Sequence, residues 1–328
     1  MPTPSPIVIA HRGASGYRPE HSRAAYELAI RMGCDAVEPD IVATSDGVLV
    51  VRHENEISGT TDVADHPEFA ERHTTKNLLG EKLTGWFTED FTWAELQTLR
   101  VRERIPRLRP GSAAHDGRQP MLRLRDVLDI VAAGGVREGR EIGVVVEVKH
   151  DAYFRSIGID LAELLAGELA ASGWPGAGRP VTVESFEPGV LDRLQERGLP
   201  ATYVFLLEAK GAPADLAQAL GSRAPSYAEI ATPAGLERWA GGYDGVSPAK
   251  SMILAPGSTL VADAHKRGLT VFTWTCRPEN AFLTKRYRAR GGRAAFGDYA
   301  GEWRALRAAG VDGVFVDHPD LGASVFRA

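Results

Sequence analysis

Residues 142–148 read IGVVVEV, a nearly continuous apolar and β-branched run in which Glu147 carries the only charge. Such a run is typical of a strand buried on both faces, as strands in parallel sheets are. Seven similar runs recur along the chain. They lie at residues 7–10, 36–43, 181–186, 202–207, 244–248, 270–275 and 313–317.

Helix-like stretches with apolar residues three and four apart separate these runs, for example at 22–33, 159–172 and 260–268. Gly33, Gly173 and Gly268 stand where these helices are expected to end. Eight strands alternating with helices favour an α/β fold, a (β/α)8 TIM-like barrel, over an open doubly wound sheet.

The length of 328 residues suits one such barrel with an insertion, so we expect a single domain over residues 1–328. Residues 55–118 are rich in charged and turn-forming residues and show no strong strand pattern. Because this segment follows directly on His53, at the end of the barrel where active sites lie, we expect an inserted subdomain or lid beside the active site; a surface excursion far from the active site is the alternative. A second irregular stretch, 277–304, separates the last two expected strands.

Composition excludes several classes of protein. A net charge of -5 provides no overall positive field for nucleic acid, so we expect no nucleic-acid partner, and any small anionic substrate must be held by local charges. The first ten residues lack the features of a secretory signal, and no apolar run approaches the roughly 20 residues that span a bilayer. We therefore expect no stable membrane insertion and a cytoplasmic protein, although an exported protein without its leader would read the same.

Two cysteines, Cys34 and Cys276, are too few for a disulfide-stapled scaffold or a thiolate zinc site of ordinary spacing. The sequence carries no signal for the oligomeric state.

The run 48–54, VLVVRHE, follows the turn residues Ser45-Asp46-Gly47 and should fold back as a hairpin on 36–43. If Thr44 and Gly47 flank the turn, Asp40 pairs with Val51 and Glu38 pairs with His53. A slip of one or two residues would still leave His53 beside the two carboxylates of that strand, Glu38 and Asp40.

His11, Arg12 and Gly13 follow the first expected strand, so their side chains should project from the end of the barrel where such enzymes keep their active sites. A histidine at a strand end is often structural when taken alone. The neighbouring residues favour a catalytic role.

Glu38 and Asp40 lie two apart on one expected strand, so their side chains share a face. Two inward carboxylates repel each other, and a hard divalent cation such as Ca²⁺ or Mg²⁺ relieves that repulsion. Glu147 can supply a third ligand, while Lys149 can neutralise a substrate phosphate. Ion pairs with arginine or lysine, including a plain Glu147–Lys149 bridge, are the structural alternative.

Trp274 suits a wall for the organic part of a substrate, because an aromatic face packs against glycerol carbons or a quaternary ammonium. A place in the core is an equal alternative.

Asp317 is expected to orient His11 or the neighbouring loop rather than to bind metal.

Taken together, these motifs resemble the glycerophosphodiester phosphodiesterase family, in family order along residues 7–320. The insertion resembles that of a branch that is often exported and calcium-dependent. Glu184 stands where the family commonly has Gln, and His21-Ser22 stands where it has Asn-Thr. The matching motifs are His11-Arg12-Gly13, Pro19-Glu20, Glu38-x-Asp40, Asp46-Gly47 leading to His53, Glu147-x-Lys149, Ser185-Phe186, Trp274 and Asp317-x-Pro319.

The resemblance implies a divalent ion on Glu38, Asp40 and Glu147, and His11 and His53 as an acid/base pair. Phosphate contacts would fall to Arg12 and Lys149. The expected reaction is metal-dependent hydrolysis of a glycerophosphodiester to glycerol 3-phosphate and an alcohol. A phospholipase-like or lysophospholipase-D-like lipid phosphodiesterase and a non-catalytic phosphate-binding barrel are the two alternatives.

Overall fold

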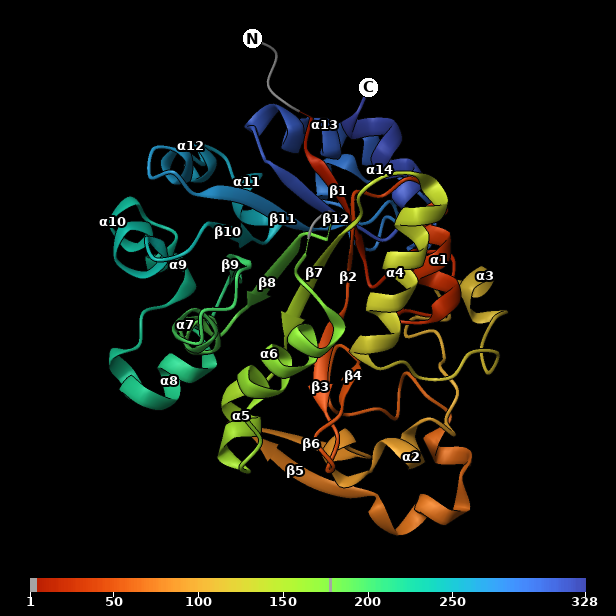
Figure 1. Cartoon of the computed structure of the whole chain (residues 1–328). Coiled ribbons are helices and arrows are strands. Elements are labelled where there is room, and N and C mark those ends of the chain that lie inside the picture. The colour runs from red at the N-terminus through yellow and green to blue at the C-terminus, as the bar shows by residue number, and fades with distance from the viewer. Residues whose placement is uncertain (1–4, 177–178) are drawn as a thin grey trace.

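The computed structural model describes residues 5–176 and 179–328, and within them parallel strands close into a barrel (Figure 1). Each predicted strand is present, which confirms the barrel. Closure comes from β1 pairing with β12 on one side and with β2 on the other, while β2 pairs in turn with β7. The barrel strands are β1 (Ile7–His11), β2 (Ala36–Glu38) with β3 (Asp40–Ala43), β7 (Gly143–Val148), β8 (Val181–Ser185), β9 (Thr202–Leu207), β10 (Gly245–Pro248), β11 (Thr270–Cys276) and β12 (Gly313–Val316).

Residues 36–43 form two strand segments rather than the single strand expected, because Pro39 interrupts them and has no backbone N–H for the ladder. Both segments keep the same neighbour: Ala36 pairs with Gly143 on β7, and Asp40 pairs with Glu147. β2 and β3 thus fill one position in the barrel.

The hairpin after β3 is present, but its register differs by one residue from the expected pairing. β4 (Leu49–Val51) runs antiparallel to β3, with Ile41 opposite Val51 where Asp40 was expected. The loop holds three residues instead of two, since the Thr44 N–H donates to the Val48 carbonyl at 3.0 Å. Gly47 takes a left-handed φ of +75°, as the last residue of such a loop commonly does. The Arg52 N–H therefore donates to the Asp40 carbonyl, and His53 follows beyond the strand end.

An outer layer of helices surrounds the barrel (Figure 1). The expected helices at 22–33, 159–172 and 260–268 are present, and each of the three glycines at their ends has a left-handed φ. The helices outside the insertion are α1 (Arg23–Arg31), α4 (Leu124–Glu138), α5 (Asp151–Ser156), α6 (Leu161–Ser172), α7 (Pro188–Glu196), α8 (Ala214–Leu220), α9 (Tyr227–Ile230), α10 (Pro233–Gly235), α11 (Lys250–Ile253), α12 (Leu260–His265), α13 (Tyr299–Ala309) and α14 (Pro319–Phe326).

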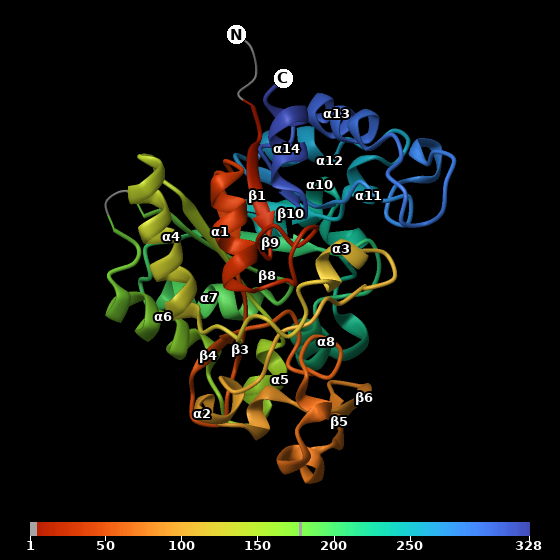
Figure 2. The same ribbon diagram turned by 90° about the vertical axis from the view of Figure 1, so that its right-hand side faces the viewer.

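The insertion lies at the carboxyl ends of the barrel strands, away from α13 and α14 (Figure 2). It contains an antiparallel pair that the sequence did not signal, β5 (Thr74–Leu78) and β6 (Glu81–Gly85). Their residues are mostly polar and exposed, so the apolar alternation of a half-buried strand is missing. The segment also contains the short α-helices α2 (Trp93–Leu96) and α3 (Pro110–Ala113) and three 3-10 helices, at Val63–Asp65, Pro67–Arg72 and Thr88–Asp90. Hydrogen bonds tie it to the barrel, for example Thr88 Oγ1 to the Ala43 carbonyl at 2.9 Å.

A small apolar layer fills the barrel interior, separate from the larger core between strands and helices. Phe315 of this layer also lines the cavity above it, and Trp274 packs against the layer. The interior layer therefore forms part of the cavity floor. Its members are Ile9, Ala36, Val145, Val204, Phe272 and Phe315. Among the described residues, no helix is long and apolar enough to span a bilayer.

Candidate active site

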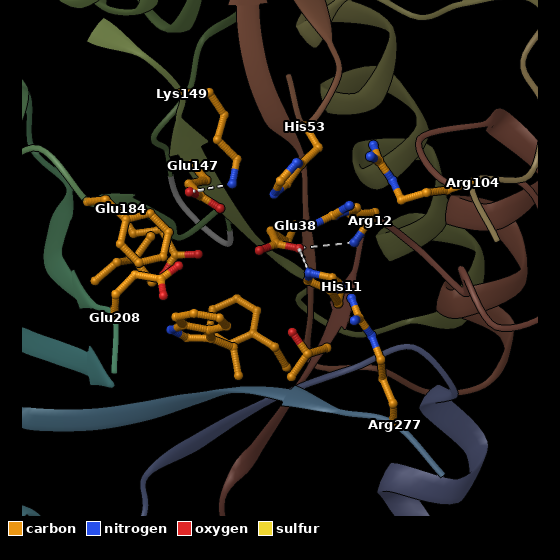
Figure 3. A pocket seen from close by; sticks show the side chains of 15 residues that line it. His11, Arg12, Glu38, His53, Arg104, Glu147, Lys149, Glu184, Glu208 and Arg277 are labelled. Atoms are coloured by element: carbon orange, nitrogen blue, oxygen red, sulfur yellow. Dashed lines mark hydrogen bonds and ion pairs between the residues drawn. The ribbon is translucent and has the colours of Figure 1, made fainter. Parts of the chain in front are cut away.

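A cavity of about 350 Å³ opens at the carboxyl end of the barrel (Figure 3). Seven of the eight predicted catalytic, metal and substrate-binding residues line it, and the eighth, Asp40, does not; Asp317, predicted to orient His11 or the neighbouring loop, does not line it either. Polar side chains that sequence reasoning did not assign to the site line it as well, namely Arg104, Glu184, Glu208 and Arg277.

His11 ends β1 and is almost fully buried. Its Nδ1 lies 2.6 Å from Asp317 Oδ1, the contact that the sequence led us to expect, and its Nε2 lies 3.9 Å from Glu38 Oε2. Burial and the neighbouring Arg12 cation outweigh Asp317 and lower the pKa of His11 to about 4. The imidazole is therefore neutral in the substrate-free protein at neutral pH.

His53 projects into the same cavity from the segment after β4 (Figure 3). Its Nδ1 is paired to Glu54. Loss of hydration within the cavity, together with the Arg12 and Lys149 cations, lowers the pKa of His53 well below its ordinary value. Each histidine thus has a carboxylate on Nδ1, which leaves Nε2 as the atom available to a ligand.

Three buried carboxylates converge between the histidines and the opposite wall: Glu38, Glu147 and Glu184 each offer one oxygen, all within 4.8 Å of one another. Glu184 is fully buried, and neither of its oxygens has a hydrogen-bond partner among the described residues. Burial and the mutual repulsion of the acids raise the pKa of Glu38 and of Glu184 well above the ordinary value. Burial raises the pKa of Glu147 to about 7.

This cluster has the chemistry of a site for a hard divalent cation. Its donors are carboxylate oxygens, which Ca²⁺ and Mg²⁺ prefer, and its unpaired buried charge is costly without a compensating cation. Sequence reasoning noted Glu184 only as a departure from a family motif. Its position at the end of β8, beside Glu147 on β7, was the available signal.

Asp40 is fully buried but is not one of these three converging carboxylates. Its Oδ2 lies 3.0 Å from His21 Nε2 and 3.2 Å from Arg12 Nε, while its Oδ1 has no hydrogen-bond partner within residues 5–176 and 179–328. Although burial opposes ionisation, Lys149, Arg12 and His21 hold the pKa of Asp40 well below its ordinary value. Its place among the metal ligands stays a prediction.

The cations of the site come from several elements. The Arg12 backbone N–H donates to Glu38 Oε2 at 3.0 Å, and its guanidinium Nη1 donates to Glu20 Oε2 at 3.1 Å. Lys149 Nζ lies 2.5 Å from Glu147 Oε1, so the ion pair weighed as an alternative is present while both residues also line the cavity. Arg104 and Arg277 add positive charge from the two irregular stretches, where no periodic pattern marks a functional residue.

Trp274 and Phe186 form an aromatic wall of the cavity, in edge-to-face contact with ring centroids 5.4 Å apart. Trp274 Nε1 donates to the Ser247 carbonyl at 2.9 Å, which fixes the ring, and the residue is half-buried. Glu208 lies on the same side of the cavity (Figure 3).

Comparison with known sequences identifies the family. The family model described as the glycerophosphoryl diester phosphodiesterase family matches residues 11–321. The chain belongs to the glycerophosphodiester phosphodiesterase family. The family and the enzyme class that the motifs predicted are thereby confirmed, and a divalent-metal site agrees with the acidic cluster.

Individual relatives agree with this glycerophosphodiester phosphodiesterase assignment. A glycerophosphodiester phosphodiesterase of Arabidopsis thaliana is 30% identical over 336 aligned positions, which cover 97% of this chain and 85% of that protein. One from Haemophilus influenzae is 30% identical over 203 positions, 59% of this chain and 53% of that protein. Among solved structures, an Oleispira antarctica phosphodiesterase in complex with the product sn-glycerol-3-phosphate is 19% identical with a TM-score of 0.63, covering 99% of this chain and 98% of that chain. That likeness shows the shared fold.

Proposed function

We propose that this enzyme hydrolyses glycerophosphodiesters to glycerol 3-phosphate and a free alcohol, with the help of one divalent cation and two histidines. The observation that supports this most directly is the meeting of His11, His53 and a buried carboxylate cluster in one cavity lined with cations. A phosphodiester is an anion with a poor leaving group. Its cleavage needs charge neutralisation and proton transfer at both the attacking and the leaving oxygen.

Glu38, Glu147 and Glu184 would hold Ca²⁺ or Mg²⁺, with Asp40 as the further ligand predicted from its motif. When bound, the cation would neutralise charge on the nonbridging oxygens of the phosphate. In the part of the chain that the structure describes, neither oxygen of Glu184 has a hydrogen-bond partner, which supports its inclusion in the ligand set.

His11 and His53 would share the proton transfers. One imidazole accepts a proton from the attacking hydroxyl, and the other donates one to the departing alcohol. The lowered pKa of each ring favours its neutral form in the substrate-free protein, so each can act as a base. A bound phosphodiester anion raises the pKa of both rings, which favours the protonated form that the acid role requires. The attacking hydroxyl is either that of water or that of the glycerol moiety beside the phosphate.

Arg12 and Lys149 would contact the phosphate. Both are buried cations on the cavity wall, where a charge-assisted hydrogen bond is stronger than in water. Trp274, with Phe186, would pack against the organic part of the substrate.

A substrate panel tests this proposal. The purified enzyme is incubated with glycerophosphocholine, glycerophosphoethanolamine, glycerophosphoglycerol and a lysophospholipid, each with Ca²⁺ and with Mg²⁺, and glycerol 3-phosphate is quantified. We expect glycerol 3-phosphate from the water-soluble diesters. Hydrolysis of the lysophospholipid alone would assign the cavity to lipid substrates, and no hydrolysis of any diester would overturn the proposal.

A further inference from the structure

The inserted segment contributes two arginines to the neighbourhood of the catalytic histidines. Arg104 and Arg109 lie five residues apart in the insertion, yet they contact the carboxylates of two different imidazole pairs. Neither was singled out by the sequence motifs, and both are supplied by a segment outside the barrel strands.

On one side, Arg109 reaches the carboxylate that pairs with His11. Its Nη2 donates to Asp317 Oδ2 at 2.6 Å, and Asp317 Oδ1 lies 2.6 Å from His11 Nδ1. The guanidinium is buried and makes further bonds to the Ser15 carbonyl at 3.1 Å and to Glu279 Oε1 at 2.7 Å. Asp317 also accepts from Arg277 Nε at 2.7 Å, so two arginines share it.

On the other side, Arg104 reaches the carboxylate that pairs with His53. Its Nη1 donates to Glu54 Oε1, and Glu54 Oε2 pairs with His53 Nδ1. The same guanidinium binds both oxygens of Glu20, from Nε at 2.9 Å and from Nη2 at 2.6 Å. Glu20 in turn accepts a hydrogen bond from Arg12. Arg104 therefore joins Glu54, the carboxylate that pairs with His53, to Glu20, the carboxylate that pairs with Arg12.

We propose that Arg104 and Arg109 are positioning residues that fix the ring orientation and tautomer of His53 and His11. A carboxylate on Nδ1 selects the tautomer with Nδ1–H and leaves the Nε2 lone pair directed at the substrate. That carboxylate performs this task only if it is itself held in place, which the two arginines do. The inference rests on the proposed roles of the two histidines.

The carboxylates that pair with the two histidines differ in the number of arginines that hold them. Asp317 retains Arg277 when Arg109 is removed, whereas Arg104 is the arginine that contacts Glu54 in the described part of the chain. Loss of Arg104 therefore reduces turnover more than loss of Arg109. Loss of Arg109, which is the more deeply buried of the two, reduces thermal stability more.

The test compares Arg104→Gln with Arg102→Gln. Arg102 lies two residues away and pairs with Asp65 at the surface, so its substitution controls for the loss of a charged pair in the same segment. We expect kcat of Arg104→Gln to fall about 10- to 100-fold, as for other residues that orient a catalytic group, with KM changed by less than about threefold. Arg102→Gln should keep wild-type values of both constants.

Two further readouts separate positioning from folding. Low millimolar guanidinium should restore part of the activity of Arg104→Ala, and ¹⁵N NMR should show His53 as the Nδ1–H tautomer in the wild type and as a tautomer mixture in the variant. His53→Ala identifies the His53 resonances and tests the underlying function at the same time.

The outcomes distinguish the two claims. If His53→Ala keeps wild-type turnover, the proposed function fails. If His53→Ala is inactive while Arg104→Gln keeps its kcat, or only its KM rises, the positioning role is refuted and Arg104 at most contacts substrate.

Discussion

At the scale of single residues, the site was largely predictable because its members follow strand ends. His11, Glu38, Glu147 and Lys149 each come at the end of an apolar run, and parallel strands end at one rim. Glu184 occupies the same kind of position, at the end of β8 beside Glu147 on the preceding barrel strand, but no second charged residue two positions along marks it as Asp40 marks Glu38 and Lys149 marks Glu147. Arg104 and Arg109 lie in an irregular segment, where no periodicity indicates which side chains point inward.

His11→Ala and His53→Ala should each lower turnover by at least about 100-fold, the lower end of a usual acid/base contribution. Thermal unfolding monitored by circular dichroism should show that both variants still fold. His265→Ala, which removes an exposed histidine paired with Asp312, is the matched control and should keep full activity. A near-wild-type rate in either active-site variant would contradict the assignment.

Divalent cation should stabilise the protein more at pH 8 than at pH 6. In the metal-free protein the pKa of Glu147 is raised from 4.5 to about 7. The folded state therefore holds this proton more tightly than the unfolded state does. The stability that this difference provides is fully present below pH 4.5 and is lost as the pH rises through about 7. A bound cation relieves the repulsion among the ionised carboxylates, whereas at pH 6 it must first displace protons. The increase in unfolding temperature on adding Ca²⁺ or Mg²⁺ measures this. Equal increases at the two pH values would be inconsistent with a carboxylate site.

The substitution Glu184→Gln tests the ligand set directly, because it keeps the shape of the side chain and removes its charge. We expect weaker cation binding by titration calorimetry, by about 10-fold or more, since a carboxylate is a far better ligand for a hard cation than an amide. Unchanged affinity would remove Glu184 from the ligand set.

At the scale of elements, the sequence predicted the β3–β4 hairpin and missed its register by one residue. The Asp46-Gly47 pair is compatible with a two-residue and with a three-residue loop. The structure has the three-residue loop, because Thr44 pairs with Val48 rather than with Gly47. β5 and β6 were missed because their polar residues carry no strand pattern. Pro39, by contrast, was visible in the sequence and accounts for the division of β2 from β3.

Gly47→Ala should destabilise the protein by about 1 kcal/mol, because a left-handed φ is costly for a residue with a Cβ. The added methyl group would meet only Leu164 at 3.6 Å, an ordinary contact, so backbone strain is the expected cause. Urea unfolding measures the change, with Gly59→Ala as the control, since Gly59 lacks a positive φ and has open space around it. A fully stable Gly47→Ala protein would refute the strained turn.

At the scale of the whole molecule, the alternation of buried apolar runs with amphipathic stretches was sufficient to predict a barrel. Closure itself depends on β2 meeting β7, a contact between segments about a hundred residues apart that no local pattern encodes. The insertion is joined to the barrel by the buried Arg109–Asp317 pair and by hydrogen bonds to β3.

These contacts predict that the insertion and the barrel unfold together. Far-ultraviolet circular dichroism and tryptophan fluorescence, which includes Trp86 and Trp93 of the insertion, should report coincident thermal transitions. An earlier, separate transition in fluorescence would indicate that the insertion is an independent unit.

The central claim is that carboxylates and histidines at the barrel rim cleave glycerophosphodiesters with the help of a divalent cation. The most direct measurement is the rate of glycerol 3-phosphate release from glycerophosphocholine after treatment with EDTA, and again after Ca²⁺ or Mg²⁺ is returned in excess. We expect the rate to fall to background in EDTA and to recover with one of the two cations. Undiminished release in the chelated sample would contradict the account.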